Sequence, residues 1–227
     1  MIKFVLMDIE GTTSSIDFVH KVLFPYSYEK MDTFIRTHQS EERVQKALDA
    51  FKAQLPNGKS DLSLSDLINQ AKQMILDDVK YGPLKTLQGF IWQQGYTDGD
   101  IKGHVYPEVP ACLQAWANKG IKLGIYSSGS VLAQKLIFGF SDHGDLTKYL
   151  SYFFDTTTGP KKESQSYQKI AKEINCSPEN ILFLSDSKDE LAAAKKAQFN
   201  VAFVSREKND VNAEAYKKVE TFEEISL

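Results

Sequence analysis

Apolar and polar residues alternate near both ends of the chain in a way that predicts a parallel sheet covered by helices. Residues 2–7 form a short apolar run that leads into a Gly-Thr pair, which is typical of a buried strand followed by a loop. After Gly103 the pattern predicts strands at 121–126, 153–155, 181–184 and 201–204, and helices at 108–119, 131–138, 164–175 and 188–198. Such alternation indicates a Rossmann-like α/β core on a mostly parallel sheet, with right-handed crossovers.

The middle of the chain has a different pattern. Between about residues 15 and 100 apolar residues recur at helical spacing with almost no strand signal, which predicts helices at 18–38, 41–54, 63–81 and 84–94. Turn signals separate them at 55–58, 82–83 and 95–99. We therefore predict an α/β core made of residues 1–14 and 101–227, with an α-helical cap inserted at 15–100. The tail, 207–227, predicts a last helix and a surface segment.

Composition narrows the class of protein. The 227 residues are 42% hydrophobic and 25% charged, with a net charge of −3, which is typical of a soluble globular protein. The basic residues are scattered, so nucleic-acid binding is not expected. The apolar runs are far shorter than the roughly 20 residues of a membrane-spanning helix, and the start lacks the pattern of a signal peptide. Cys112 and Cys176 form neither a metal pair nor a disulfide framework. We expect a cytoplasmic monomer without nucleic-acid or membrane partners.

Four groups of polar residues follow predicted strands or lie in the loops beyond them. They are Asp8 with Glu10, Ser127 with Ser128, Lys161, and Asp186 with Glu190. In open α/β sheets, sites form where the strands end, so we expect these groups to converge. Each also has a simpler interpretation taken alone: Asp8 as a turn cap, the serines and Asp186 as helix caps, Lys161 as a solvated lysine, and Glu190 as a partner of a helix dipole.

Together these residue types fit phosphoryl transfer. A carboxylate such as Asp8 can attack phosphorus and form an aspartyl-phosphate. Its approach to a phosphate costs about 4 kcal/mol for each pair of like charges at ~4 Å, so cations are required. One Mg²⁺ and Lys161 supply three positive charges against four on the phosphate, Asp8 and Asp186. An ionised Glu10 would double the deficit, so we expect it protonated and able to donate to the leaving oxygen.

The motifs resemble a known family. Asp8-Ile9-Glu10-Gly11-Thr12, Ser127, Lys161 and Asp186 match in order the four motifs of the haloacid dehalogenase-like phosphatases. The glutamate at position 10, the segments 126–131, 154–167 and 181–186, and Phe24-Pro25-Tyr26-Ser27 are similar to the enolase-phosphatases (acireductone synthases) of methionine salvage. The resemblance covers essentially the whole chain.

The resemblance implies a Mg²⁺-dependent enzyme that enolises 5-(methylthio)-2,3-dioxopentyl phosphate, a small phosphorylated diketone, and then dephosphorylates it to the acireductone 1,2-dihydroxy-5-(methylthio)pent-1-en-3-one. Carried onto this sequence, one Mg²⁺ would be bound by Asp8, Asp186 and Glu10, the last through its backbone carbonyl. Ser127, Ser128 and Lys161 would bind substrate, and Asp8, Glu10 and Lys161 would act in catalysis.

Several alternatives stay open at this point. The base for enolisation is Glu10, Lys161 or a cap residue. Phe18, Phe24 and Tyr26 either contact the methylthio tail or pack in the core of the cap, which we expect to act as a lid. The nearest rival function is a plain Mg²⁺-dependent phosphatase acting on another small phosphate ester. A dehalogenase needs neither Mg²⁺ nor an acid at Glu10, and a binding module needs no intact nucleophile.

Overall fold

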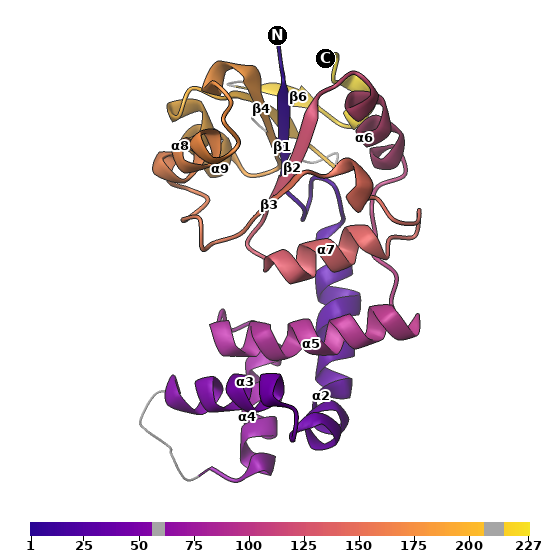
Figure 1. The fold of residues 1–227 in the computed structure, drawn as a ribbon, viewed down its shortest axis with the longest axis vertical. Coiled ribbons are helices and arrows are strands. Elements are labelled where there is room, and N and C mark those ends of the chain that lie inside the picture. The colour runs from indigo at the N-terminus through magenta and orange to yellow at the C-terminus, as the bar shows by residue number, and fades with distance from the viewer. Residues whose placement is uncertain (56–61, 207–215) are drawn as a thin grey trace. The chain divides into compact units, whose positions relative to one another are not determined.

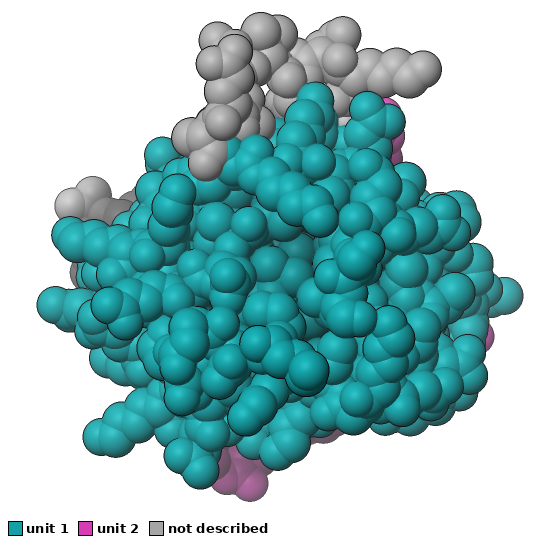
Figure 2. Space-filling view, turned by 90° about the horizontal axis from the view of Figure 1, so that it is seen from above, with its two compact units in different colours: residues 1–16, 102–227 teal, residues 17–101 magenta. Residues whose placement is uncertain are grey.

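The computed structural model describes residues 1–55, 62–206 and 216–227 (Figure 1). The chain divides into two compact units, one made of residues 1–16 and 102–227 and the other of residues 17–101, which Figure 2 colours separately. From the sequence we predict the insert at residues 15–100. The predicted turn at 55–58 lies, after Leu55, outside the described residues.

The first unit is built on one parallel sheet. Its strand order is β3-β2-β1-β4-β5-β6, and every neighbouring pair is parallel. The strands are β1 Phe4–Met7, β2 Lys122–Tyr126, β3 Tyr152–Phe154, β4 Ile181–Ser185, β5 Asn200–Val204 and β6 Lys217–Val219. The two strands at its centre, β1 and β4, come from distant parts of the chain, so their carboxyl ends bring residues 8 and 186 to one edge.

The central strands are uniformly apolar because both faces of the sheet are covered. Every residue of β1 and β4 is buried, including neighbours whose side chains point to opposite faces. The covering helices are α6 Val109–Asn118, α7 Val131–Gly139, α8 Ser164–Glu173 and α9 Lys188–Lys196. Helix α6 packs on β2, α7 on β3, and α9 on β4 and β5. The predicted Rossmann-like α/β class is confirmed.

The tail differs from the prediction. Its first part, 207–215, lies outside the described residues, and residues 216–227 contain β6 and a 3-10 turn, Phe222–Glu224, in place of a helix. Strand β6 extends the sheet because Val219 is buried beside β5, where its carbonyl accepts the Ser205 N–H at 2.9 Å. The described part of the tail therefore contains a strand that we did not predict, since three residues that pair with a sheet edge carry no distinctive local signal.

The second unit is helical throughout the part that the structure describes. Its elements are α1 Ile16–Phe18, a π-helical turn Val19–Leu23, α2 Phe24–His38, α3 Glu42–Ala53, α4 Leu64–Leu76 and α5 Gly82–Asp98. Helix α2 packs on α4 and α5, and α3 packs on α5. A separate core fills the space between them, built on residues such as Met31, Phe51, Leu67 and Leu87.

Helices α4 and α5 end at other residues than predicted, and α5 also begins at Gly82, within the predicted turn. Helix α4 stops at Leu76, before the predicted residue 81, because Asp78 takes a left-handed conformation with φ 48°. Helix α5 continues through Gly95, where we predicted a break, and ends at Gly99 with φ 82°. Gly95 is needed for packing: a Cβ there would lie 2.6 Å from the ring of Tyr26. A glycine required for close contact between helices gives the same local signal as a glycine in a loop.

No helix in the described residues is both long enough and apolar enough to cross a lipid bilayer.

Candidate active site

The nucleophile predicted at the end of β1 is held from several directions. The Asp8 side chain is 6% exposed. Its Oδ1 accepts hydrogen bonds from the Lys161 amine at 2.5 Å and from the Ile9 N–H at 2.8 Å. The hydroxyl of Ser185, at the end of β4, donates to Oδ2 at 3.3 Å. Because these donors fix both oxygens, the carboxylate has a defined orientation at the carboxyl edge of the sheet.

The loop after Asp8 brings a second acid close to the first. Ile9 O accepts three successive backbone N–H groups, from residues 12, 13 and 14, and so closes a tight turn. Gly11 in this turn has φ 72°, and a Cβ there would lie 2.1 Å from Oδ2 of Asp186. The Thr12 hydroxyl accepts the backbone N–H of Asp186 at 3.1 Å. The turn therefore provides both the space and a hydrogen bond that hold Asp186 beside it.

Glu10 faces the loop after β2. The Ser127 hydroxyl donates to Oε2 of Glu10 at 3.2 Å and accepts the Gly129 N–H at 3.1 Å. Burial, followed by the charge of Asp8, raises the pKa of the Glu10 carboxyl above its usual value. A raised pKa favours the protonated form, which is the form that a general acid requires.

Three hydroxyl groups fix the loop that carries Lys161. Tyr126 donates to Gly159 O at 2.8 Å, Ser166 to Pro160 O at 2.7 Å, and Tyr167 to Lys161 O at 2.7 Å. The Lys161 side chain is only 9% exposed, so it is not the solvated lysine of the simpler interpretation. The loop holds an ammonium group inside the site.

Lys161 is shared by two carboxyls, of which the sequence singled out only one as functional. Its Nζ lies 2.5 Å from Asp8 Oδ1 and 2.9 Å from Glu190 Oε2. Burial alone would lower the pKa of Lys161, but the charges of Asp8 and Glu190 raise it above its usual value. Burial, followed by the charge of Asp8, raises the pKa of Glu190 to about 7.

Glu190 changes the charge balance that the sequence suggested. A buried fourth carboxyl adds a negative charge whenever it ionises. The single ammonium of Lys161 is then insufficient to neutralise the carboxylates of the site. Glu190 lies in the first turn of α9, directly after the loop that carries Asp186, and this position is the signal that could have given it a role in the site.

The two serines after β2 differ in their environment. Ser127 is fully buried, whereas Ser128 is exposed. The N-cap of α7 is Ser130, whose hydroxyl accepts the Ala133 N–H at 3.3 Å. The N-cap position of α9 is held by Ser187, which leaves Asp186 outside that helix. The N-cap positions of α7 and α9 are therefore occupied by Ser130 and Ser187, which are neighbours of the predicted site residues.

The oxygen atoms around Asp8 suit a hard divalent cation. Asp186 retains exposed surface, yet burial of its carboxyl, followed by the charge of Asp8, raises its pKa to about 7. An acid whose ionisation is disfavoured by a neighbouring carboxylate gains stability from a divalent cation bound between the two. No cluster of three or more His, Cys, Asp or Glu side chains suited to a metal occurs in the described ranges. Two carboxylates, completed by backbone oxygen, water or phosphate, are nevertheless a donor set that Mg²⁺ accepts.

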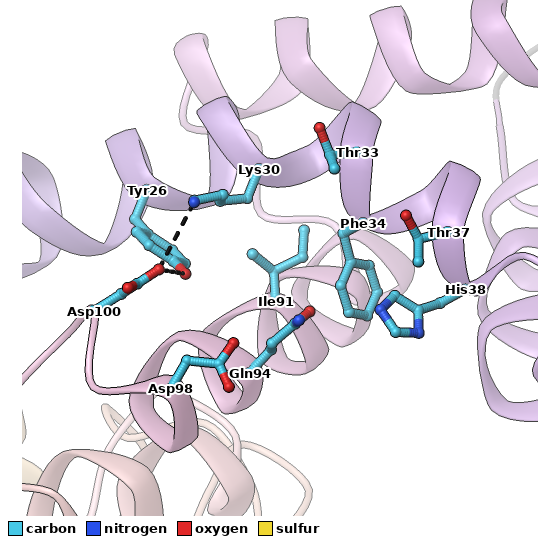
Figure 3. A pocket seen from close by; sticks show the side chains of 10 residues that line it. All are labelled: Tyr26, Lys30, Thr33, Phe34, Thr37, His38, Ile91, Gln94, Asp98 and Asp100. Atoms are coloured by element: carbon cyan, nitrogen blue, oxygen red, sulfur yellow. Dashed lines mark hydrogen bonds and ion pairs between the residues drawn. The ribbon is translucent and has the colours of Figure 1, made fainter.

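Grooves also lie within the described part of the second unit, among them a smaller and a larger one. One, of about 160 Å³, lies between α2 and α5. In Figure 3 the Lys30 amine and the Tyr26 hydroxyl both turn toward Asp100, at 3.7 and 2.9 Å. Asp98 lines the same groove. Because these acids outnumber the ammonium, this groove disfavours a phosphate, in contrast to the surroundings of Lys161.

The other groove is mostly apolar and larger, at about 320 Å³. Phe24, Tyr28, Ile75 and Leu76 are among its lining residues. Of the three aromatic residues suggested for the methylthio tail, Phe24 lines this groove, Tyr26 lines the polar one, and Phe18 is buried. The second unit therefore does not gather these three side chains around one cavity.

Comparison with known proteins places the chain among characterised families. Residues 2–198 match the family model of haloacid dehalogenase-like hydrolases. The chain is 48% identical over 229 residues to enolase-phosphatase E1 of Sulfurihydrogenibium sp., covering 100% of this chain and 99% of the relative, and 43% identical over 224 residues to the Drosophila melanogaster protein of that name, covering 95% and 88%. The crystal structure of the Unknown transcript 4 protein of Saccharomyces cerevisiae is similar, with a TM-score of 0.82, 33% identity, and coverage of 99% of this chain and 100% of that one.

Proposed function

Because this chain belongs to the haloacid dehalogenase-like hydrolases, and within them to the enolase-phosphatase E1 family, we propose that it converts 5-(methylthio)-2,3-dioxopentyl phosphate to the acireductone and phosphate in methionine salvage. The observation that carries this proposal is the arrangement around Asp8. An oriented carboxylate, a buried ammonium at 2.5 Å and a carboxyl with a raised pKa meet at the carboxyl edge of one sheet.

In the phosphatase half-reaction, Asp8 is the nucleophile. One of its carboxylate oxygens forms a bond to phosphorus while the bond from phosphorus to the leaving oxygen breaks, which gives an aspartyl-phosphate. Lys161 offsets the charge that accumulates on the phosphoryl oxygens. The N–H groups of the loop after β2, near Ser127 and Ser128, offer further donors to those oxygens.

Glu10 supplies and then recovers a proton. In its protonated form it donates to the leaving oxygen as the phosphorus–oxygen bond breaks. The resulting carboxylate then accepts a proton from the water that attacks the aspartyl-phosphate, which releases phosphate and regenerates Asp8. The Ser127 hydroxyl, 3.2 Å from Oε2, holds the Glu10 side chain in place for both steps.

Asp8, Asp186 and the backbone carbonyl of Glu10 would hold one Mg²⁺. When bound, the metal supplies positive charge that reduces repulsion between the carboxylates and the phosphate. The oxygen-rich donor set and the raised pKa of Asp186 support this assignment.

Enolisation requires a base beside the diketone. Lys161 lies between Asp8 and Glu190, and its raised pKa keeps it protonated, so it is better suited to stabilise an enolate oxygen than to remove a proton. This leaves Glu10 or a residue of the second unit as the base in our proposal.

Turnover of the diketone phosphate followed by ultraviolet absorbance and phosphate release together tests the proposal. We expect phosphate release to accompany the absorbance of the conjugated enediol, and both signals to disappear with EDTA. Phosphate release from the diketone without the chromophore would identify a plain phosphatase, and EDTA-resistant turnover would contradict the metal assignment.

A further inference from the structure

Arg206, a residue outside all four motif groups, binds the turn that follows Asp8. It lies two residues after β5, and its side chain is 8% exposed. Its Nε and Nη2 both donate to the carbonyl oxygen of Thr12, at 3.0 and 2.6 Å. Two donors from one planar guanidinium fix the direction of that carbonyl as well as its position.

The rest of the guanidinium is anchored independently of the turn. Its Nη1 lies 2.5 Å from Glu108 Oε1 and donates to Glu220 O at 3.1 Å. The ring of Tyr106 lies below its plane, with 4.0 Å between Cζ and the ring centroid. Arg206 therefore joins Thr12 to the start of α6 and to the tail after β6, and neither of these elements carries a residue of the proposed chemistry.

Thr12 is the link from Arg206 to the site. It is fully buried, its carbonyl is held by Arg206, and its hydroxyl accepts the backbone N–H of Asp186 at 3.1 Å. The neighbouring Gly11 leaves the space that the Asp186 carboxyl occupies. A shift of the Thr12 backbone would therefore displace the acid that lies beside Asp8.

We infer that Arg206 is a positioning residue that holds the 9–14 turn, and through Thr12 sets the place of Asp186 relative to Asp8. The inference rests on the proposed function, because the consequence of that placement is the affinity of the two acids for Mg²⁺. Loss of a group that orients metal ligands without contacting the metal typically lowers metal affinity by about 10- to 100-fold.

The test measures Mg²⁺ affinity without turnover, from the rise in melting temperature as Mg²⁺ is added to the substrate-free protein. We expect R206M to raise the half-saturating Mg²⁺ concentration about 10-fold or more, and R206K to have a smaller effect because lysine keeps the charge but cannot give two fixed donors to Thr12. In activity assays kcat at limiting Mg²⁺ should fall and recover at high Mg²⁺, with KM for the substrate little changed.

Two controls separate positioning from loss of stability. R206M leaves the Glu108 carboxylate without its partner, so R206M/E108Q is measured beside it, and this pair should show the same loss of Mg²⁺ affinity. E108Q alone leaves the Thr12 contacts in place, and Val219→Ala removes buried volume from the tail strand away from Thr12. Both should lower the melting temperature with little change in half-saturating Mg²⁺.

A double-mutant cycle tests whether Arg206 acts on Asp186 through Thr12. Thr12→Val removes the hydroxyl that binds Asp186, so the effect of R206M on Mg²⁺ affinity should be much smaller in T12V than in the wild type. Equal effects in both backgrounds would overturn the inference, as would half-saturation in R206M within about twofold of the wild type. If the wild type showed neither a Mg²⁺ response nor turnover, the proposed function would fail and the inference with it.

Discussion

At the scale of single residues, the candidate site is a group of carboxyls that share one ammonium. Asp8 and Glu190 both contact Lys161, while Glu10 and Asp186 lie close enough to Asp8 for its charge to raise their pKa values. The four acids therefore cannot have the same role. Asp8, which accepts three hydrogen bonds, is suited to attack phosphorus. Glu10, which has a raised pKa and accepts a hydrogen bond from Ser127, is suited to carry a proton.

Asp8→Asn should abolish turnover while the fold remains intact. The substitution keeps the volume of the side chain but removes the nucleophilic oxygen, and loss of a covalent nucleophile lowers kcat by at least about 10³-fold. Steady-state kinetics would measure the loss, and circular dichroism with thermal melting would check the fold. A folded D8N protein with more than about a hundredth of wild-type kcat would contradict the assignment.

Glu10→Gln should slow the reaction in a way that depends on the leaving group. Glutamine cannot transfer a proton, so kcat should fall about 10²-fold or more for an alkyl phosphate such as the diketone. An activated ester such as p-nitrophenyl phosphate leaves without protonation and should be affected much less. Equal losses with both substrates would show that Glu10 is not the general acid.

At the scale of elements, the loops at the carboxyl ends of the strands carry the site and the helices determine their places. Tyr126 in β2 and Tyr167 in α8 both bind the loop that presents Lys161. In the second unit, the crossing of α2 and α5 depends on Gly95, since a side chain there would overlap the ring of Tyr26. The glycines of α5 are thus not equivalent.

Gly95→Ala should destabilise the protein by about 1–3 kcal/mol, because the added methyl forces two packed helices apart. Gly82, in the first turn of the same helix, is the matched control: apart from its chain neighbours and the nearby backbone of its own helix, no described atom lies within 4 Å of a Cβ there. Gly82→Ala should change stability by less than about 1 kcal/mol, because the gain in helix propensity is opposed by the restriction that Pro83 places on the preceding residue. Urea unfolding of both variants measures the difference, and equal effects would refute the packing argument.

At the scale of the whole molecule, the stability of the metal-free protein should depend on the site. Asp186 has an ordinary pKa of 3.8 and a pKa of about 7 in the fold. A raised pKa means that the folded state binds its proton more tightly than the unfolded state does. This contribution to stability is present below about pH 4 and is lost as the pH rises through about 7.

Asp186→Asn isolates this effect from the other acids. In EDTA, wild type should lose stability relative to D186N between about pH 4 and 8, because only the wild type must ionise a carboxyl beside Asp8. Saturating Mg²⁺ at pH 8 should reverse the order, since it binds the ionised pair. Thermal melting of both proteins across this pH range is the measurement. Parallel pH profiles for the two proteins would contradict the effect.

Much of the architecture was readable from local patterns. A strand buried on both faces must be apolar at every position, and an amphipathic helix repeats its apolar face every three to four residues, so the α/β alternation and the helical insert were both predicted. The misses have a non-local cause: Gly95 and the residues of β6 owe their conformation to neighbours that are distant in the sequence.

The sequence by itself determined which residues have the chemistry for phosphoryl transfer, because carboxylates and a lysine follow strands whose carboxyl ends share an edge. Only the tertiary structure decided how these groups pair. Lys161 meets Asp8 across 153 residues and Arg206 meets Thr12 across 194. The tertiary structure also places Glu190 in contact with Lys161. The physical reason is that charge pairing depends on distance in space, and local periodicity carries no information about contacts between residues so far apart along the chain.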